Sequence, residues 1–223
     1  MTIQHHPADD VLLAHAAGHL SAAASLLIQA HVGMCAQCQE RLCTLDMVGG
    51  VLLEDMAPAM LQPDALARTL AVLDGPDRCA RRRTEPLRAG SSRPAGWPEG
   101  AFWPSALDAC KVSPWHWLGP GVRWSRVTVP GAADANVLLL RIGAGKRLPQ
   151  HTHSEVEWTQ VLHGAFHDGR ALFGPGDFDG ADTQVHHQPV VEPGGECICL
   201  AGIEGRVVFD GAMARWVGAL VGM

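Results

Sequence analysis

The first third of the chain has the pattern of amphipathic helices. It is rich in Ala, Leu and Met, and Leu26, Leu27 and Ala30 fall near one face of a helix. Ser21 is a typical N-cap for this helix, and Gly33 is a typical stop signal. Further helices are expected from Asp9 or Asp10 to about His19, from about Cys35 to before Pro58, and over 65–73. The pattern predicts a small bundle of about four helices.

From about residue 101 the pattern changes to short runs in which apolar and polar residues alternate. Alternation with a period of two residues is typical of strands, and clear examples cover 122–129, 135–142 and 196–201. Gly and Pro separate the runs, with turn signals roughly every eight to twelve residues. This spacing favours an all-β barrel or sandwich of the jelly-roll type.

Composition divides the chain at the same place. All seven Trp and all five Phe lie at or after Trp97, and there is no Tyr. Residues 76–100 hold six Arg and four Pro, can bury little apolar surface and are expected to form a flexible linker. We therefore predict a two-domain α + β protein with a helical domain at 1–75, a linker at 76–100 and a β domain at 101–223.

Charge narrows the class of partner. Residues 1–75 hold eight acidic and two basic residues, which gives this part the same net charge of −6 as the whole chain. Phosphates would repel such a domain, so we expect no direct binding of nucleic acid and disfavour a DNA-binding zinc regulator. The acidic surface suits a partner that is itself basic.

Cysteine usage and the absence of targeting signals favour a cytoplasmic location. The seven Cys are odd in number and closely spaced, which argues for reduced thiols or metal ligands rather than a disulfide framework. No apolar run approaches the ~18 residues that span a bilayer. The first residues lack a cationic segment followed by an apolar stretch, so no secretory signal is expected.

A first candidate metal site lies in the helical part. His31 precedes the C-x2-C pair Cys35 and Cys38 by four residues, and helix-start amides favour two thiolates that reach one point. Structural zinc needs four ligands in a closed tetrahedron, and His5 or His6 is the natural fourth. A redox pair is the alternative, but the helical context and the fixed His offset favour zinc.

Zinc would matter for the stability of this part. A domain of about 75 residues without Phe, Trp or Tyr has a modest core. A structural zinc can contribute ~10–16 kcal/mol of apparent binding energy, comparable with the ~5–15 kcal/mol stability of a typical domain. Loss of the metal is therefore expected to loosen or unfold the bundle.

A second candidate metal site lies in the β part. The segment from Gly145 to Gly164 reads G-x5-H-x-H-x3-E-x6-G, with its ligand positions at His151, His153 and Glu157. All three numbers are odd, so on a strand the side chains share one face. A later histidine could complete the set, and we favour His187 over His186. Three His and one Glu suit Zn, Fe, Mn or Ni.

These motifs carry a resemblance to a known family. The segment from 145 to 164 matches the first motif of the cupin superfamily, and 174–178 resembles the turn that opens the second motif, although the spacing before His187 is stretched. A helical H-x24-H-x3-C-x2-C site followed by one cupin domain resembles the ChrR-type zinc-binding anti-sigma factors. The resemblance covers nearly the whole chain.

The resemblance implies an inhibitor rather than an enzyme. In this family the N-terminal domain binds and inhibits an extracytoplasmic-function sigma factor, and the cupin domain is needed for release under oxidative stress, typically by singlet oxygen. It implies structural Zn2+ in the helical domain and a second divalent metal, expected to be Zn2+, in the cupin. The implied ligands are His6, His31, Cys35 and Cys38 for the first site and His151, His153, Glu157 and His187 for the second.

A metal-dependent cupin enzyme of the dioxygenase or isomerase type, with an accessory zinc domain, is the alternative. Such a site keeps an open coordination position and adds an acid or base, and no second acid-base group is evident in the sequence. Cys197 and Cys199 share one strand face about 6.5 Å apart, which favours packed thiols over a disulfide. Together with Trp158 and the cupin site they are candidate targets of an oxidant.

Overall fold

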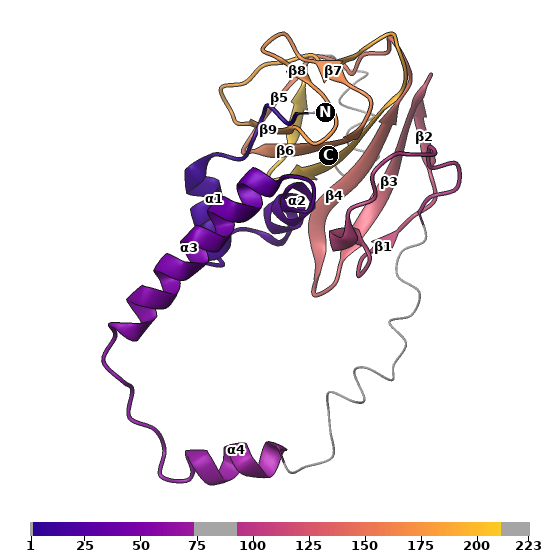
Figure 1. The fold of residues 1–223 in the computed structure, drawn as a ribbon. Coiled ribbons are helices and arrows are strands. Elements are labelled where there is room, and N and C mark those ends of the chain that lie inside the picture. Colours follow the sequence, from indigo (N-terminus) through magenta and orange to yellow (C-terminus); the bar gives the residue numbers. More distant parts are fainter. Residues whose placement is uncertain (1, 74–92, 211–223) are drawn as a thin grey trace.

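The fold is taken from a computed structural model that describes residues 2–73 and 93–210 (Figure 1). Four helices come first, and a β-rich part follows, as the sequence predicts. Ser21 caps the second helix, because its side chain accepts a hydrogen bond from the Ala24 N–H at 3.1 Å. The helices are α1 (Asp9–Ala16), α2 (Ala22–Val32), α3 (Ala36–Glu54), α4 (Ala65–Leu73) and the short 3-10 turn η1 (Ser105–Leu107).

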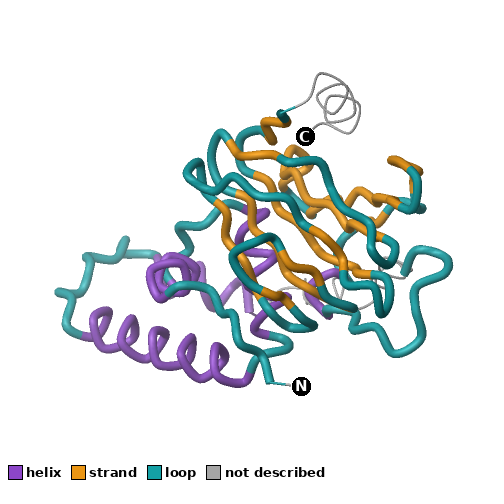
Figure 2. Tube along the Cα trace, turned by 90° about the horizontal axis from the view of Figure 1, so that it is seen from above, coloured by secondary structure: helices purple, strands orange, loops and turns teal. Residues whose placement is uncertain are grey.

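The strands form a barrel-like β part with helices gathered on one side (Figure 2). A seven-stranded sheet has the order β1-β3-β4-β11-β6-β9, with β2 beside β3, and the smaller sheets are β10-β7-β8 and β12-β5. The strands are β1 (Lys111–Val112), β2 (His116–Gly119), β3 (Val122–Val129), β4 (Ala132–Ile142), β5 (His151–His153), β6 (Glu157–His163), β7 (Phe166–His167), β8 (Leu172–Phe173), β9 (Phe178–Ala181), β10 (Val190–Val191), β11 (Cys197–Ile203) and β12 (Val207–Phe209). The predicted all-β architecture of this part is confirmed.

Helix α2 packs directly on the large sheet. The Leu27 side chain is fully buried, and its Cδ1 lies 2.9 Å from the point where a Cβ would stand on Gly202 of β11. Leu27 and Ile28 belong to the same apolar cluster as Ile198 and Leu200. The helices and the β part therefore share one core, a contact that the division into 1–75 and 101–223 does not imply.

Strand β11 is buried along its whole length because both of its faces are covered. Ile198 and Leu200 face α2, whereas Cys197, Cys199 and Ala201 belong to a second cluster inside the barrel. Alternate side chains of a strand point to opposite faces. A strand between two apolar layers must therefore be apolar at every position.

The helices differ in how much they contribute to the core. Leu12 of α1 and Cys38 of α3 are fully buried against α2, but α4 has no buried residue and lies apart from the other helices (Figure 1). The packed helical unit thus consists of α1, α2 and the first half of α3. Within the described residues, no helix is both long and apolar enough to cross a membrane.

The structure describes only the C-terminal end of the predicted linker. Residues 76–92 lie outside the described residues. The end at 93–100 lies on the β part, where the Trp97 ring meets the Trp103 ring edge-on at 5.0 Å and the Gly96 carbonyl accepts a hydrogen bond from Arg141 at 2.7 Å.

Two candidate metal centres

The turn between α2 and α3 brings three of the predicted zinc ligands together. His31 lies in the last turn of α2, and Cys35 is the N-cap of α3, where its Sγ accepts a hydrogen bond from the Cys38 N–H at 3.5 Å. The His31 Nε2 lies 3.3 Å from the Cys38 Sγ. All three side chains are almost completely buried. The helix start thus directs donor atoms to one point, as the spacing suggests.

His6 approaches the same point from the N-terminal segment. Its Nδ1 lies 3.4 Å from the Sγ atoms of both Cys35 and Cys38. The His5 ring instead packs against Phe173 at 4.6 Å. Of the two histidines that the spacing leaves open, the structure therefore brings His6 into the cluster.

The N-terminal segment itself is held by the β part. The backbone N–H groups of Gln4 and His5 donate to the Asp177 carboxylate at 2.7 and 3.0 Å. The Phe178 N–H donates to the His5 carbonyl at 3.0 Å. Residues 4–5 therefore run along the start of β9 and deliver His6 to the helices.

The donor set fits a tetrahedral zinc ion. The four ligand atoms lie within 4.8 Å of one another. Zn–S and Zn–N bonds of about 2.3 and 2.0–2.1 Å place nitrogen and sulfur roughly 3.6 Å apart, close to the 3.3–3.4 Å seen here. Burial, followed by the neighbouring Cys35, raises the pKa of the Cys38 thiol to about 12. A bound cation would instead hold these thiols as thiolates.

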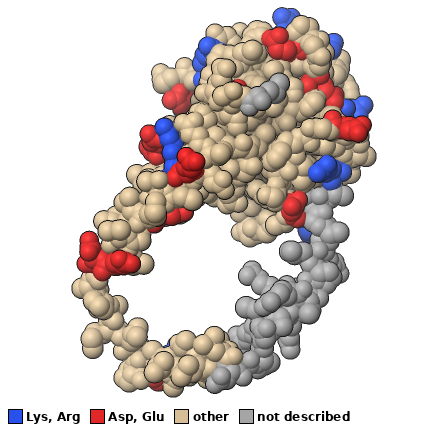
Figure 3. Space-filling view, in the orientation of Figure 1, with Lys and Arg blue, Asp and Glu red and all other residues tan. Residues whose placement is uncertain are grey.

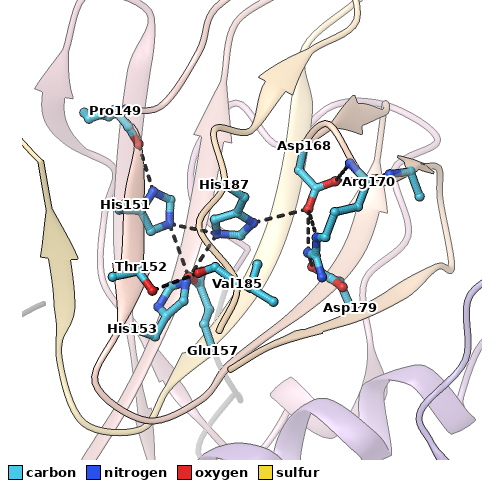
Figure 4. Close-up of polar contacts among 11 residues, drawn as sticks. Pro149, His151, Thr152, His153, Glu157, Asp168, Arg170, Asp179, Val185 and His187 are labelled. Atoms are coloured by element: carbon cyan, nitrogen blue, oxygen red, sulfur yellow. Dashed lines mark hydrogen bonds and ion pairs between the residues drawn. The ribbon is translucent and has the colours of Figure 1, made fainter. Parts of the chain in front are cut away.

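The second cluster lies inside the barrel (Figure 4). His151 and His153 come from β5, Glu157 begins β6, and His187 pairs with His151 through reciprocal backbone hydrogen bonds of 3.0 and 3.1 Å. The His187 Nε2 lies 3.1 Å from that of His151 and 3.2 Å from that of His153. The Glu157 Oε2 lies 3.2 Å from the His153 Nε2. These four ligand atoms also fall within 4.8 Å of one another.

The tautomers of this cluster require a cation or a proton at its centre. The Nδ1 of His151 lies 2.8 Å from the Pro149 carbonyl, so it must carry the ring proton. The Nδ1 of His187 likewise donates to the Asp168 carboxylate at 3.2 Å. The two Nε2 lone pairs then face each other at 3.1 Å, which is repulsive unless a cation lies between them. A tetrahedral ion would hold such nitrogens about 3.3 Å apart.

The pKa shifts within the cluster also indicate that a proton or a cation belongs at its centre. Burial lowers the pKa of His153 to about 4. Burial opposes ionisation of Glu157, but the hydrogen bond and charge of His151 outweigh it and keep the pKa of Glu157 below its usual value. The hydrogen bond and charge of Glu157 outweigh burial in turn and raise the pKa of His151. A proton on His151 thus holds the carboxylate ionised, and a bound divalent cation would take the place of that proton.

The structure adds a supporting group that the sequence does not reveal. Asp168 accepts from His187 and from the Arg170 Nε at 2.7 Å, and Arg170 also reaches Asp179 of β9 at 2.5 Å. Carboxylates of this kind fix the orientation and tautomer of metal-binding histidines. No spacing rule connects Asp168 with His187, because their approach depends on how the barrel closes.

The histidine next to His187 lies elsewhere. The His186 Nε2 contacts Asp210 at 2.9 Å, and its side chain is about half exposed, at 49%. Adjacent side chains of an extended segment point in opposite directions. The preference for His187 over His186 as a member of the cluster agrees with this placement.

The space beside the second cluster is small. A cavity of about 30 Å³ is lined by His151, Glu157, His187 and Cys199 among other residues, whereas pockets for organic ligands occupy roughly 300–1,000 Å³. Cys197 and Cys199 are buried with their Sγ atoms 3.5 Å apart. The hydrogen bond with Cys197, followed by burial, raises the pKa of Cys199. The cavity admits water-sized molecules rather than an organic substrate.

Comparison with known proteins agrees with both halves of this architecture. Residues 105–204 match the family model described as the ChrR cupin-like domain. The chain is 39% identical over 217 residues to the anti-sigma-E factor ChrR of Cereibacter sphaeroides, an alignment that covers 97% of each protein. It also resembles the crystal structure of Rhodobacter sphaeroides SigE in complex with the anti-sigma ChrR, with a TM-score of 0.70, 38% identity and coverage of 91% of this chain and 100% of that chain.

The similarity extends over the helices as well as the β part. The match over 97% of the chain is to a named anti-sigma factor and not to an enzyme. The prediction that the protein is not an enzyme is therefore confirmed. The chain belongs to the ChrR family of anti-sigma factors.

Proposed function

We propose that this protein binds and inhibits an extracytoplasmic-function sigma factor through its N-terminal helices and releases it when an oxidant such as singlet oxygen acts on the cupin. Membership of the ChrR family supports the first half, since one structure of a relative contains SigE bound to ChrR. The observation that carries the proposal for this chain is an exposed apolar surface on the helices.

The exposed apolar surface runs over the second half of α3, the connecting segment 55–64 and α4, and we call it the docking surface. Its large apolar side chains are between 50% and 98% exposed. Large apolar surfaces of this kind mark sites of protein–protein interaction. The members are Met47, Val48, Val51, Leu52, Leu53, Met56, Met60, Leu61, Leu66, Leu70, Val72 and Leu73.

Acidic groups border the docking surface. Asp46, Glu54, Asp55 and Asp64 are in or beside α3 and α4 and are exposed, and Figure 3 displays acidic side chains around the tan surface of this region. A protein that binds DNA is itself basic, so its charge complements this border. The combination favours a basic sigma factor over nucleic acid as the occupant.

The proposed metals have different tasks. Zn2+ bound by His6, His31, Cys35 and Cys38 fixes the turn between α2 and α3 and so orients the docking surface. A second divalent metal, also Zn2+, occupies His151, His153, Glu157 and His187. An oxidant small enough for the adjoining cavity can reach these ligands and Cys199.

Binding is tested by coexpression and pull-down of the full chain with a sigma factor encoded nearby. Leu52→Asp places a charge in the docking surface and is expected to abolish the complex. Leu172→Asp is the matched control, because Leu172 is 56% exposed on the β part. If both variants bind as the unaltered chain does, or if the unaltered chain forms no complex, the proposal is wrong.

Release is tested on the same complex. His153→Ala removes a cupin ligand and is expected to keep the complex intact while blocking its dissociation by oxidant. His31→Ala removes a zinc ligand and is expected to prevent the complex from forming. Oxidant release that is unchanged in His153→Ala would contradict a role of the cupin metal.

A further inference from the structure

A side chain of the cupin sheet contacts the zinc-ligand cluster of the helices, which consists of His6, His31, Cys35 and Cys38. The His31 Nδ1 lies 3.0 Å from the Oε1 of Gln160 on β6, and both residues are fully buried. The Gln160 amide nitrogen donates to the Val161 carbonyl at 3.1 Å and faces the Met34 sulfur at 3.6 Å. These contacts turn the amide oxygen towards His31.

This orientation decides the tautomer of His31. An amide oxygen can only accept a hydrogen bond, so the His31 Nδ1 carries the proton and Nε2 keeps a free lone pair. The same Nε2 lies 3.3 Å from the Cys38 Sγ and points to the centre of the zinc-ligand cluster. Gln160 therefore selects the form of His31 that can bind a metal.

The strand that carries Gln160 also carries a ligand of the cupin site. Glu157 lies three residues earlier on β6, with its carboxylate 3.2 Å from the His153 Nε2 inside the barrel. Side chains alternate along a strand, so Glu157 and Gln160 point to opposite faces. One short strand thus contacts both clusters.

The other histidine of the helical cluster rests on the neighbouring strand. Gln160 is paired with Phe178 in the register of β6 and β9, and the Phe178 N–H donates to the carbonyl of His5, next to His6. Both histidines of the helical cluster are therefore supported by β6 and β9. Movement of these two strands would displace His6 and His31 relative to the cysteines of α3.

We infer that Gln160 is a positioning residue for His31 that makes the zinc affinity of the helical site depend on occupancy of the cupin site. The inference rests on the proposed function in treating the two clusters as metal sites. Partners of metal-binding histidines affect metal affinity by about 10–100-fold. Coupling between two sites is reciprocal and is typically about 5–150-fold.

The experiment measures metal binding by the full chain without a partner. Co2+ is titrated into the protein and competed with Zn2+, and thiolate-to-cobalt absorption reports only the helical site, because the cupin cluster has no sulfur ligand. The variants are Gln160→Met, His153→Ala and the two combined. Glu204→Ala is the control, because it removes the hydrogen bond from Ser21 at the same helix–sheet interface without touching His31.

Gln160→Met is expected to weaken Zn2+ binding at the helical site by about 10–100-fold and His153→Ala by about fivefold or more. The double variant should bind no more than about twofold less tightly than Gln160→Met alone, since the path between the sites is already broken. Glu204→Ala should stay within about twofold of the unaltered chain. A general loss of interface stability would instead lower affinity in Glu204→Ala as well.

Two results would overturn the inference. One is zinc affinity of Gln160→Met that equals that of the unaltered chain. The other is a double variant whose loss equals the product of the two single losses, since independent sites combine in that way. Sigma-factor binding is measured separately at saturating Zn2+. If the two metal sites show no coupling but the chain still binds the sigma factor, only this inference is wrong. If the two metal sites are coupled but the chain does not bind the sigma factor, only the proposed function is wrong.

Discussion

The contact between Leu27 and Gly202 gives a direct test of the shared core. Leu27 is fully buried in α2, and Gly202 lies opposite it on β11. A methyl group added at Gly202 would stand 2.9 Å from the Leu27 Cδ1, whereas carbon atoms prefer about 3.5–4.0 Å. Leu27→Ala removes the obstacle that makes Gly202→Ala costly, so the two substitutions should compensate each other in part.

The magnitudes follow from this geometry. Leu27→Ala empties a fully buried site and should cost about 3 kcal/mol of the free energy of unfolding. Gly202→Ala overpacks the interface and should cost about 1.5 kcal/mol. In the double variant the new methyl has room and regains about 0.8 kcal/mol, so the total cost is about 2.2 kcal/mol. The coupling energy is therefore about 2 kcal/mol.

The assay is urea unfolding of the metal-loaded full chain, followed by circular dichroism, for the four members of the cycle. Leu172→Ala combined with Gly202→Ala is the control pair, because Leu172 is exposed on β8, and its effects should add within about 0.5 kcal/mol. Additive effects of Leu27→Ala and Gly202→Ala, or a cost below about 1 kcal/mol for Leu27→Ala, would refute the packing of α2 on β11.

Three further predictions concern single side chains. Asp177→Ala leaves the Gln4, His5 and Gly174 N–H groups without their acceptor and should cost about 3 kcal/mol in urea unfolding and weaken Zn2+ binding at the helical site, whereas Asp177→Asn should cost less. Asp168→Ala should lower metal affinity of the cupin site by about 10–100-fold in competition with a chelator, whereas Asp210→Ala, next to His186, should not. Burial lowers the pKa of His15, against the opposing charge of Asp46, so His15 binds fewer protons in the folded chain than in the unfolded chain. Its contribution to stability is therefore full above about pH 6.5 and declines as the pH falls below that value. His15→Gln should reduce this decline in urea midpoints measured from pH 7 to pH 5, and an unchanged profile would contradict it.

Local spacing explains why much of the candidate chemistry could be predicted. The His31, Cys35 and Cys38 cluster needs only a helix end and a helix start close together in sequence. The His151, His153 and Glu157 set needs only the alternation of a strand and the turn that follows it. Such patterns depend on neighbouring residues and survive without knowledge of the remaining fold.

Contacts between distant segments could not be predicted in the same way. The choice of His6 over His5 depends on Asp177 and Phe178, which lie more than 170 residues away and hold the N-terminal segment on β9. The apolar sequence of β11 indicates that the strand is buried, but it does not indicate that α2 covers one of its faces. The packing of these distant segments on each other leaves no periodic signal in the chain.

The sequence by itself determined the helical and β halves and the His, Cys and Glu residues at the centre of both clusters, because these follow from short-range periodicity and spacing. Its motifs also carried the resemblance to the family. Only the tertiary structure decided that the halves share a core and that Gln160 of the cupin sheet contacts His31. The physical reason is that a buried hydrogen bond and a packed helix–sheet contact depend on the closure of the chain in three dimensions, to which residues 129 positions apart contribute jointly.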